Sequence, residues 1–405
     1  MTTKILFPLS VLLLTLSLPA VARFESYSSL EVAMKEPDKV KVLELRNQGL
    51  NQLPASIERL RNIEVLDLSD NQLTEIPDAV YKMTNLKKLI LLGNKIQNLP
   101  ERLGSLRNLE ELHISQAYNN QTAENNSTKA LPTFLFKMPT LRVLDAAYYG
   151  VSEIPVEIGG SHIQELYLNN NRLVSLPTQL FSCTTLRVID LSNNFIISLP
   201  EQIAPNTALQ VLKINNNALN DLPTSIAHLS ALREFSLSAN PLLKPVIDIK
   251  KIVPLTHLAI LHLNGTNIEE LPADFGKLNH LEDLDLSSNK LTSLPEEIGG
   301  LSSIRRLNLA NNKLTDLPQS FLSLSELIKL DISHNAFKSI PGKLGYLTQL
   351  EMLNMSYNTE MANYSENIKS MQSVRFVNLK NTGFNIFQVQ HINEILVACN
   401  VLFDK

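Results

Sequence analysis

The feature that most constrains this chain is a pattern that returns about every 23 residues. Residues 281–300 read LEDLDLSSNKLTSLPEEIGG, and residues 61–80 (RNIEVLDLSDNQLTEIPDAV) and 304–321 (IRRLNLANNKLTDLPQSF) share its frame. A fixed period in the twenties predicts a solenoid of stacked units and outranks local secondary-structure signals. The first apolar positions of the fifteen units are Val40, Ile63, Leu86, Leu109, Leu141, Ile163, Leu186, Leu209, Leu232, Leu258, Leu281, Ile304, Leu327, Leu350 and Val374.

Each unit changes its hydrophobic period part of the way along. Leu284 and Leu286 alternate with Asp283 and Asp285, which predicts a short strand with its leucines on one face. A Leu-Pro or Ile-Pro step then recurs in twelve units, and proline suits the first position of a short helix. We therefore expect a strand, a turn and a short helical return in each unit. Such a unit buries its leucines only when its neighbours stack on it.

An asparagine marks the corner that follows the strand in ten units. Asparagine tolerates tight turns, and its amide can bind backbone groups that a buried bend leaves unpaired. We expect these side chains to be buried and to form an internal ladder. They are Asn71, Asn94, Asn171, Asn194, Asn217, Asn240, Asn289, Asn312, Asn335 and Asn358.

The consensus LxxLxLxxNxLxxLPxxIxxLxx resembles the leucine-rich repeat family in its 23-residue form, over about residues 40–400. The resemblance implies an α/β fold: a right-handed β-α superhelix shaped like a horseshoe, with a parallel concave sheet and short helical convex returns. It implies less about function, because the family shares architecture rather than chemistry.

The two ends of the chain differ from the repeats. Residues 1–22 combine Lys4, an apolar run and the motif Ala20-Val21-Ala22, which predicts a secretory signal peptide. The expected location is therefore secreted, periplasmic or extracellular, with an uncleaved signal anchor as the alternative. The mature chain from Arg23 has no further apolar stretch long enough for an integral membrane span.

Both ends of the repeat domain, expected over 40–386, need caps. Residues 23–39 are predicted to form an N-terminal capping helix, with a capping box at Ser28–Glu31 and a helical end near Lys35. Residues 387–405 are predicted to form a C-terminal capping helix. Cysteine-rich caps, usual in animal and plant extracellular relatives, are missing from the sequence, which favours a bacterial member of the family.

The composition excludes several classes of function. The chain has a formal charge of −4 and no basic stripe, which argues against nucleic acid as a partner. Its two cysteines, Cys183 and Cys399, form neither a metal cluster nor a disulfide framework, and we expect two buried thiols. Motifs for phosphate binding, nucleophilic catalysis and metal ligation are missing from the sequence. We therefore predict no enzyme, no cofactor and no metal.

Isolated histidines and aspartates do not change this interpretation. His113, His262 and His334 lie in different units without a carboxylate or serine at a telling spacing, so we expect surface histidines. The aspartates at strand centres favour a solvated polar face over a cation site. Three units carry irregular segments, which should map to loops or altered returns: 116–129, 240–254 and 357–367.

One group of residues on the expected concave face departs from the polar pattern. Units three to six place apolar, aromatic and histidine side chains there, with Asp145 among them as a polar anchor, and grouped residues of this kind suggest a contact patch. Ordinary variation in an unused face is the alternative. We expect these side chains to face solvent, whereas Tyr149, at the asparagine position, is free to turn inward. The candidate ligand-binding residues are Ile90, Leu92, His113, Asp145, Tyr148 and Tyr167.

The function predicted from these features is that of a non-catalytic binding module with a rigid concave surface for a protein or glycan ligand. Three alternatives are an intracellular signalling scaffold of the Leu-Pro repeat type, a surface adhesin and an enzyme of unrecognised type. The sequence leaves the identity of the ligand, the oligomeric state and the pathway open.

Overall fold

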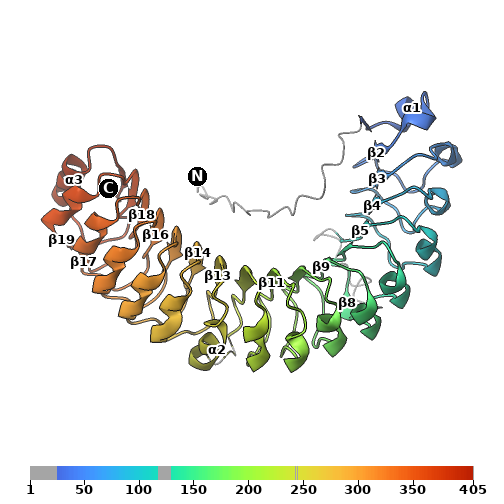
Figure 1. Cartoon of the computed structure of the whole chain (residues 1–405). Coiled ribbons are helices and arrows are strands. Elements are labelled where there is room, and N and C mark those ends of the chain that lie inside the picture. Colours follow the sequence, from blue (N-terminus) through green and yellow to red (C-terminus); the bar gives the residue numbers. More distant parts are fainter. Residues whose placement is uncertain (1–24, 117–128, 242, 244, 405) are drawn as a thin grey trace.

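The computed structural model of the chain describes residues 25–116, 129–241, 243 and 245–404. These residues form one curved solenoid in which parallel strands line the concave side and short helices cover the convex side (Figure 1). The solenoid that the 23-residue period predicts and the α/β horseshoe that the family resemblance implies are both confirmed. The expected signal peptide at 1–22 and most of the expected loop at 116–129 lie outside the described residues.

A parallel sheet of 17 strands follows the inner arc from one end to the other. Each unit adds one strand, which pairs with the strands of the units before and after it. The strands are β1 (Ser26–Tyr27), β2 (Val42–Glu44), β3 (Val65–Asp67), β4 (Lys88–Ile90), β5 (Glu111–His113), β7 (Val143–Asp145), β9 (Glu165–Tyr167), β10 (Val188–Asp190), β11 (Val211–Lys213), β12 (Glu234–Ser236), β13 (Ile260–His262), β14 (Asp283–Asp285), β15 (Arg306–Asn308), β16 (Lys329–Asp331), β18 (Met352–Asn354), β20 (Phe376–Asn378) and β21 (Asn400–Leu402).

The register of the sheet keeps equivalent residues of neighbouring units side by side. Leu284 of β14 lies between Leu261 and Leu307 of the adjoining strands, and all three leucines are buried. Asp283 and Asp285 flank Leu284 and are half-buried. Because side chains alternate along a strand, the first and third residues point to the concave surface while the central one enters the core. Burial of one leucine side chain contributes roughly 1.5–3 kcal/mol, and every unit repeats it.

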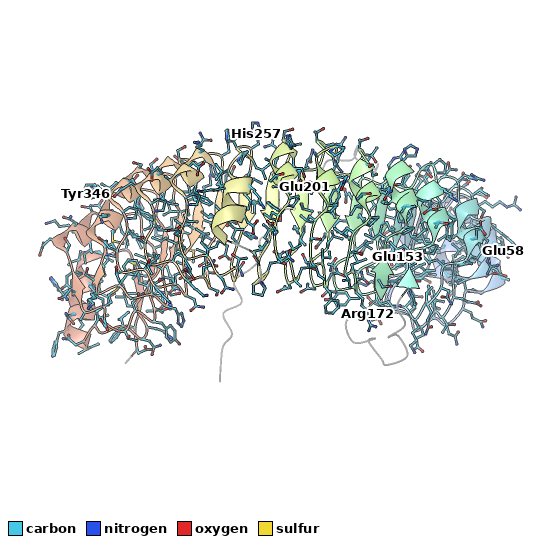
Figure 2. All side chains as sticks on the ribbon, turned by 90° about the horizontal axis from the view of Figure 1, so that it is seen from below. Glu58, Glu153, Arg172, Glu201, His257 and Tyr346 are labelled. Carbon is cyan, nitrogen blue, oxygen red and sulfur yellow. The ribbon has the colours of Figure 1, made fainter. Side chains whose placement is uncertain are left out.

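Most returns on the convex side are 3-10 helices of five residues, while η1 (Pro37–Lys39) and η10 (Glu201–Ile203) have three residues. Figure 2 labels Glu58, Glu201 and Tyr346, which lie on three of these helices. The other 3-10 helices of the described residues are η2 (Ala55–Arg59), η3 (Asp78–Lys82), η4 (Glu101–Ser105), η7 (Thr133–Lys137), η8 (Val156–Gly160), η9 (Thr178–Ser182), η11 (Thr224–His228), η12 (Ala273–Lys277), η13 (Glu296–Gly300), η14 (Gln319–Ser323), η15 (Gly342–Tyr346) and η16 (Glu366–Ser370).

The proline of each Leu-Pro step precedes the helix instead of occupying its first position, so that detail of the prediction is wrong. Pro295 has φ −68° and ψ 154°, an extended conformation, and η13 begins one residue later. The fixed φ of proline suits both extended and helical backbone, which leaves ψ free to adopt the extended value. The Pro295 carbonyl then accepts the first helical hydrogen bond, from Ile298 N–H at 3.1 Å.

An asparagine side chain binds three backbone segments at the corner after the strand. In the example of Asn217, Nδ2 donates to the carbonyls of Leu191 (3.0 Å) and Ile214 (3.3 Å), while Oδ1 accepts from Ile196 N–H (2.9 Å). One amide thereby joins its own turn to the preceding unit and satisfies backbone groups at a buried corner. Equivalent bonds from Nδ2 to the preceding unit are made by Asn71, Asn94, Asn171, Asn194, Asn217, Asn240, Asn289, Asn312, Asn335 and Asn358.

The N-terminal cap is shorter than predicted. Strand β1 pairs with β2, and α1 (Leu30–Ala33) makes a single turn before η1. The expected capping box is not formed, because the N-cap residue Ser29 makes no side-chain hydrogen bond to the helix. Pro37 also disfavours helical backbone at Glu36, which limits how far α1 can extend.

The C-terminal cap combines a helix with a strand, so the predicted helix over 387–405 is too long. Helix α3 (Ile386–Ile395) begins with a capping box between Asn385 and Gln388. Strand β21 then pairs with β20 in parallel. The edge of β20 offers backbone groups that need partners, and the Leu379 N–H donates to the Leu402 carbonyl at 2.8 Å.

The three irregular units each carry an extra element. Short strands β6 (Lys129–Ala130) and β8 (Val151–Glu153) pair with each other, as do β17 (Ser339–Ile340) and β19 (Asn363–Tyr364). Unit nine replaces its 3-10 helix by α2 (Pro245–Ile252), which lies on the convex side (Figure 1). The buried Asp248 anchors α2, because its carboxylate accepts from Leu222 N–H at 3.0 Å and from Lys251.

We expect Asn217→Leu to lower the free energy of unfolding by about 1–3 kcal/mol, because the buried groups at Leu191, Ile214 and Ile196 lose their partner. Asn220→Leu in the same unit is the matched control, since Asn220 is exposed, and it should change stability by less than about 0.5 kcal/mol. Urea titration followed by circular dichroism measures both. Equal stabilities for the two variants would contradict the role assigned to the asparagine amide.

Candidate functional site

The sheet register brings four of the six candidate residues into one row. Ile90 pairs with His113, His113 with Asp145, and Asp145 with Tyr167, across strands β4, β5, β7 and β9. Leu92 and Tyr148 follow the ends of β4 and β7. We refer to Ile90, Leu92, His113, Asp145, Tyr148 and Tyr167 as the concave patch. All six are half-buried, because neighbouring strands cover part of each side chain on the concave surface.

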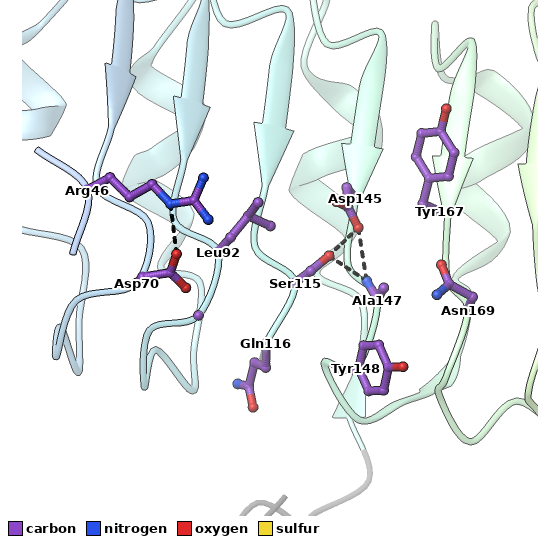
Figure 3. A pocket seen from close by; sticks show the side chains of 11 residues that line it. Arg46, Asp70, Leu92, Ser115, Gln116, Asp145, Ala147, Tyr148, Tyr167 and Asn169 are labelled. Atoms are coloured by element: carbon purple, nitrogen blue, oxygen red, sulfur yellow. Dashed lines mark hydrogen bonds and ion pairs between the residues drawn. The ribbon is translucent and has the colours of Figure 1, made fainter. Parts of the chain in front are cut away.

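A cavity of about 400 Å³ opens beside this row (Figure 3). Four patch residues line it, namely Leu92, Asp145, Tyr148 and Tyr167, whereas Ile90 and His113 lie outside its lining. Its volume falls within the range of sites that hold small molecules or side chains. We refer to it as the concave pocket. Sequence reasoning missed its other lining residues, which are Arg46, Asp70, Gly93, Ser115, Gln116, Ala147 and Asn169.

The polar groups of the concave pocket are bonded mainly to one another. Arg46 Nε lies 2.8 Å from Asp70 Oδ2 at one side. Figure 3 shows Tyr167 at the opposite side, with Ser115 and Asp145 between them. The Ser115 hydroxyl donates to Asp145 Oδ1, which also accepts from Ala147 N–H at 3.2 Å. The sequence alone does not predict these contacts, because Ser115 follows β5 whereas Asp145 ends β7, and the two residues are 30 positions apart.

His113 lies between two carboxylates, so the prediction of an unaccompanied surface histidine is wrong for this residue. Its Nε2 is 3.3 Å from Glu111 Oε2, and its Nδ1 is 3.5 Å from Asp145 Oδ2. Lys88 Nζ lies 2.6 Å from the same Glu111 carboxylate. His262 likewise lies 3.8 Å from an oxygen of Asp283, so the prediction is wrong there too.

These contacts set the charges of the site. Burial lowers the pKa of His113, but the bonds to Asp145 and Glu111 outweigh it, and the pKa is raised above 6.5. Hydrogen bonding from His113 lowers the pKa of Glu111 to about 2. Burial raises the pKa of Asp145, yet the contacts of His113, Ser115 and Ala147 bring it below its ordinary value. Both carboxylates are therefore ionised at neutral pH.

Three tyrosines have distinct positions around the site. Burial raises the pKa of Tyr167, whose hydroxyl donates to Glu165 Oε2 at 2.8 Å. Tyr148 has φ 56°, a left-handed conformation that costs a bulky residue on the order of 1–3 kcal/mol. Tyr149 is buried at the asparagine position, and its hydroxyl donates to the Gln97 carbonyl at 3.0 Å. The left-handed conformation of Tyr148 recurs at the equivalent corner residue of other units, such as Asn170 and Asn193, so it belongs to the repeat.

The described part of the chain contains no group of three histidine, cysteine, aspartate or glutamate residues arranged to hold a metal ion. Within those same residues, no helix is long and apolar enough to cross a membrane. The two cysteines are unpaired thiols; Cys183 is buried and Cys399 is half-buried.

We expect the pKa of His113 to exceed 6.5 in the folded chain and to fall towards that value in Asp145→Asn. A pKa raised on folding means that the stabilisation by His113 is complete below pH 6.5 and is lost as pH rises through the folded pKa. NMR titration of the imidazole Cε1–H signals measures the pKa, with His228, which faces the Ser225 carbonyl instead of a carboxylate, as the internal comparison. An unchanged His113 titration in Asp145→Asn would contradict the pairing.

Solved structures with the same architecture come from several organisms. A leucine-rich repeat protein of Leptospira interrogans is 27% identical, covers 94% of this chain and 100% of its own, and has a TM-score of 0.77. The internalin InlF of Listeria monocytogenes is 20% identical over 85% of this chain and 88% of its own, with a TM-score of 0.60. The plant peptide hormone receptor RGFR1, solved with RGF2, is 19% identical over 93% of this chain and 76% of its own, with a TM-score of 0.54.

Family models agree with these structures. A leucine-rich repeat region model matches residues 34–144, and a leucine-rich repeat model matches 256–314 and 304–359. No curated protein sequence matches the chain. With the repeat frame, the asparagine ladder and the concave sheet, these matches show that the chain belongs to the leucine-rich repeat family.

Proposed function

We propose that this chain is an exported binding module that holds a protein ligand, or else a glycan, against its concave patch. The observation that carries the proposal is the concave pocket itself. Leu92, Tyr148 and Tyr167 line it together with polar side chains, on or directly after strands that the sheet fixes in place. A ligand therefore meets a preformed surface, and little side-chain entropy is lost on binding.

The pairing of the polar groups favours an anchor residue of a protein as the occupant. Arg46 is bound to Asp70, Asp145 to Ser115, and Tyr167 to Glu165. Breaking these pairs would cost desolvation energy, so an apolar or aromatic anchor beside Leu92 and Tyr167 gains more from the pocket than a strongly polar ligand does. The plant receptor of the same fold was solved in complex with RGF2, which shows that such a solenoid can hold a partner.

The arrangement also supports a role without catalysis. Ser115 bonds to Asp145, and Asp145 faces His113, so the carboxylate stands between the hydroxyl and the imidazole. An activated serine needs the reverse order, in which the histidine accepts the proton of the nucleophile. Ser115 therefore lacks the histidine base of such a triad, and the lowered pKa of Asp145 makes that carboxylate a weak base.

We expect the double variant Ile90→Asp with Tyr167→Ala to weaken the ligand more than tenfold, about 1.4 kcal/mol, because it removes central apolar contacts. The ligand is first captured by the mature chain from its native envelope or medium. Affinity is then measured by surface plasmon resonance. The control is Ile260→Asp with His262→Ala, a similar change on β13, which should leave the affinity unchanged.

Because Ile90 and Tyr167 are half-buried, circular dichroism melts are run on both double variants. If Ile90→Asp with Tyr167→Ala melts like the unmodified chain and keeps full affinity, the binding site lies elsewhere on the solenoid. If its melting temperature falls by more than a few degrees, the milder pair Ile90→Thr with Tyr167→Phe is measured instead. This pair keeps most of the side-chain volume. It should still reduce affinity, because it removes apolar contacts of Ile90 and the hydroxyl contact of Tyr167.

Export rests on the sequence of residues 1–22. We expect N-terminal sequencing of the native chain to begin at Arg23, because the motif Ala20-Val21-Ala22 fits signal peptidase cleavage. A chain that begins at Met1 and stays inside the cell would favour the intracellular scaffold instead.

A further inference from the structure

A second cavity, of about 610 Å³, lies among the returns of units twelve to fourteen. Its walls come from η14, η15 and the start of η16, next to the paired strands β17 and β19, which Figure 1 shows near the C-terminal end of the solenoid. Its lining includes Gln319, Ser339, Gly342, Tyr346 and Asn367. We refer to this cavity as the convex groove. It shares no lining residue with the concave pocket.

Three polar side chains of the convex groove are neutral and available. Within the described residues, no hydrogen bond involves the side chains of Gln319, Ser339 or Asn367, all of which are exposed. Each amide offers both donors and an acceptor, and the serine hydroxyl offers both in one group. This contrasts with the concave pocket, whose polar groups are bonded mainly to one another.

The charged residues of the groove neutralise each other. Lys343 Nζ lies 3.1 Å from Asp316 Oδ2 and also donates to the Leu317 carbonyl. An anionic ligand would meet Asp316 and a cationic one would meet Lys343, so either would have to break this pair. The groove therefore suits a ligand without net charge.

Tyr346 adds a flat apolar surface. Tyr346 is 60% exposed at the end of η15, and it lines the groove with Gln319 and Asn367. An exposed aromatic face loses water favourably when an apolar surface covers it. One face of a pyranose ring carries only C–H groups, while its rim carries hydroxyls that act as donors and acceptors at once. A ring plus neutral amides therefore matches a sugar.

Gly342 keeps the groove open. In the other eleven units with a Leu-Pro or Ile-Pro step, the residue after the proline carries a side chain. A Cβ at Gly342 would lie 3.4 Å from Asn367 Nδ2 and 3.4 Å from Ser365 Oγ, which is ordinary contact. The backbone at Gly342 is also outside the left-handed region that requires glycine. A larger residue at Gly342 would instead cover the Asn367 amide and the Ser365 hydroxyl.

From these observations we propose that the convex groove binds a neutral oligosaccharide. Tyr346 stacks on the C–H face of one sugar ring. Gln319, Ser339 and Asn367 bond to its hydroxyls, and the space above Gly342 admits the ring. The proposal does not rest on the concave patch, because the two cavities share no lining residue.

The test applies the mature chain to an array of neutral oligosaccharides, including malto-, cello- and N-acetylated chito-oligosaccharides. The strongest binder is then titrated by calorimetry at up to about 10 mM, since single sugar sites are weak. We expect binding that falls at least tenfold in Tyr346→Ala and in Gly342→Leu. Gly342→Leu is the sharper variant, because it fills the groove without removing any contact in the core.

Two matched controls separate the site from general effects. Tyr357→Ala removes another exposed tyrosine, and Ala55→Leu enlarges the residue after a proline in unit one. Both should bind the sugar as the unmodified chain does. No binding anywhere on the array, or equal binding in Gly342→Leu with an unchanged melt, would overturn the proposal.

Discussion

The side-chain amide of the corner asparagine is the interaction on which the rest of this structure depends. A strand of three residues cannot turn sharply into a buried corner without leaving carbonyls and N–H groups unpaired. In each of ten units one amide supplies both a donor and an acceptor there, and it reaches into the preceding unit, as Asn217 does with Leu191 and Ile196. The same contact therefore closes the corner and fixes the distance between units.

The fixed spacing of the units has a functional consequence on the concave side. Because the register is constant, residues 22 to 32 positions apart in the chain become immediate neighbours, as Ile90, His113, Asp145 and Tyr167 do. A few changes at equivalent positions then create a continuous surface. Most units keep their leucines and their asparagine beneath this surface, whereas unit five, under the concave patch, buries Ala146 and Tyr149 at these positions. Side chains on the concave and convex sides can therefore vary while the core stays packed.

Much of the fold could be predicted from the sequence. A strict period identifies the strands, the buried leucines and the residues that become neighbours on adjacent strands. What the period cannot give are contacts that depend on side-chain conformation across strands, such as the bond from Ser115 to Asp145 or the position of His113 between two carboxylates. The repeat period also does not predict the structure of the two chain ends. The local sequence of 387–405 favours a helix throughout. Strand β21 nevertheless forms at its end, because it pairs with the edge of β20, which would otherwise be exposed.

The most direct test of the account is hydroxyl-radical footprinting of the tyrosines in the presence of the captured protein ligand. If the concave patch is the binding site, labelling of Tyr148 and Tyr167 is reduced. Labelling of Tyr346, at the end of η15, stays unchanged, as does that of Tyr357, which follows β18 nine units away from Tyr148. Reduced labelling of Tyr346 or Tyr357, with Tyr148 and Tyr167 unaffected, would contradict the central claim that the concave patch holds the ligand.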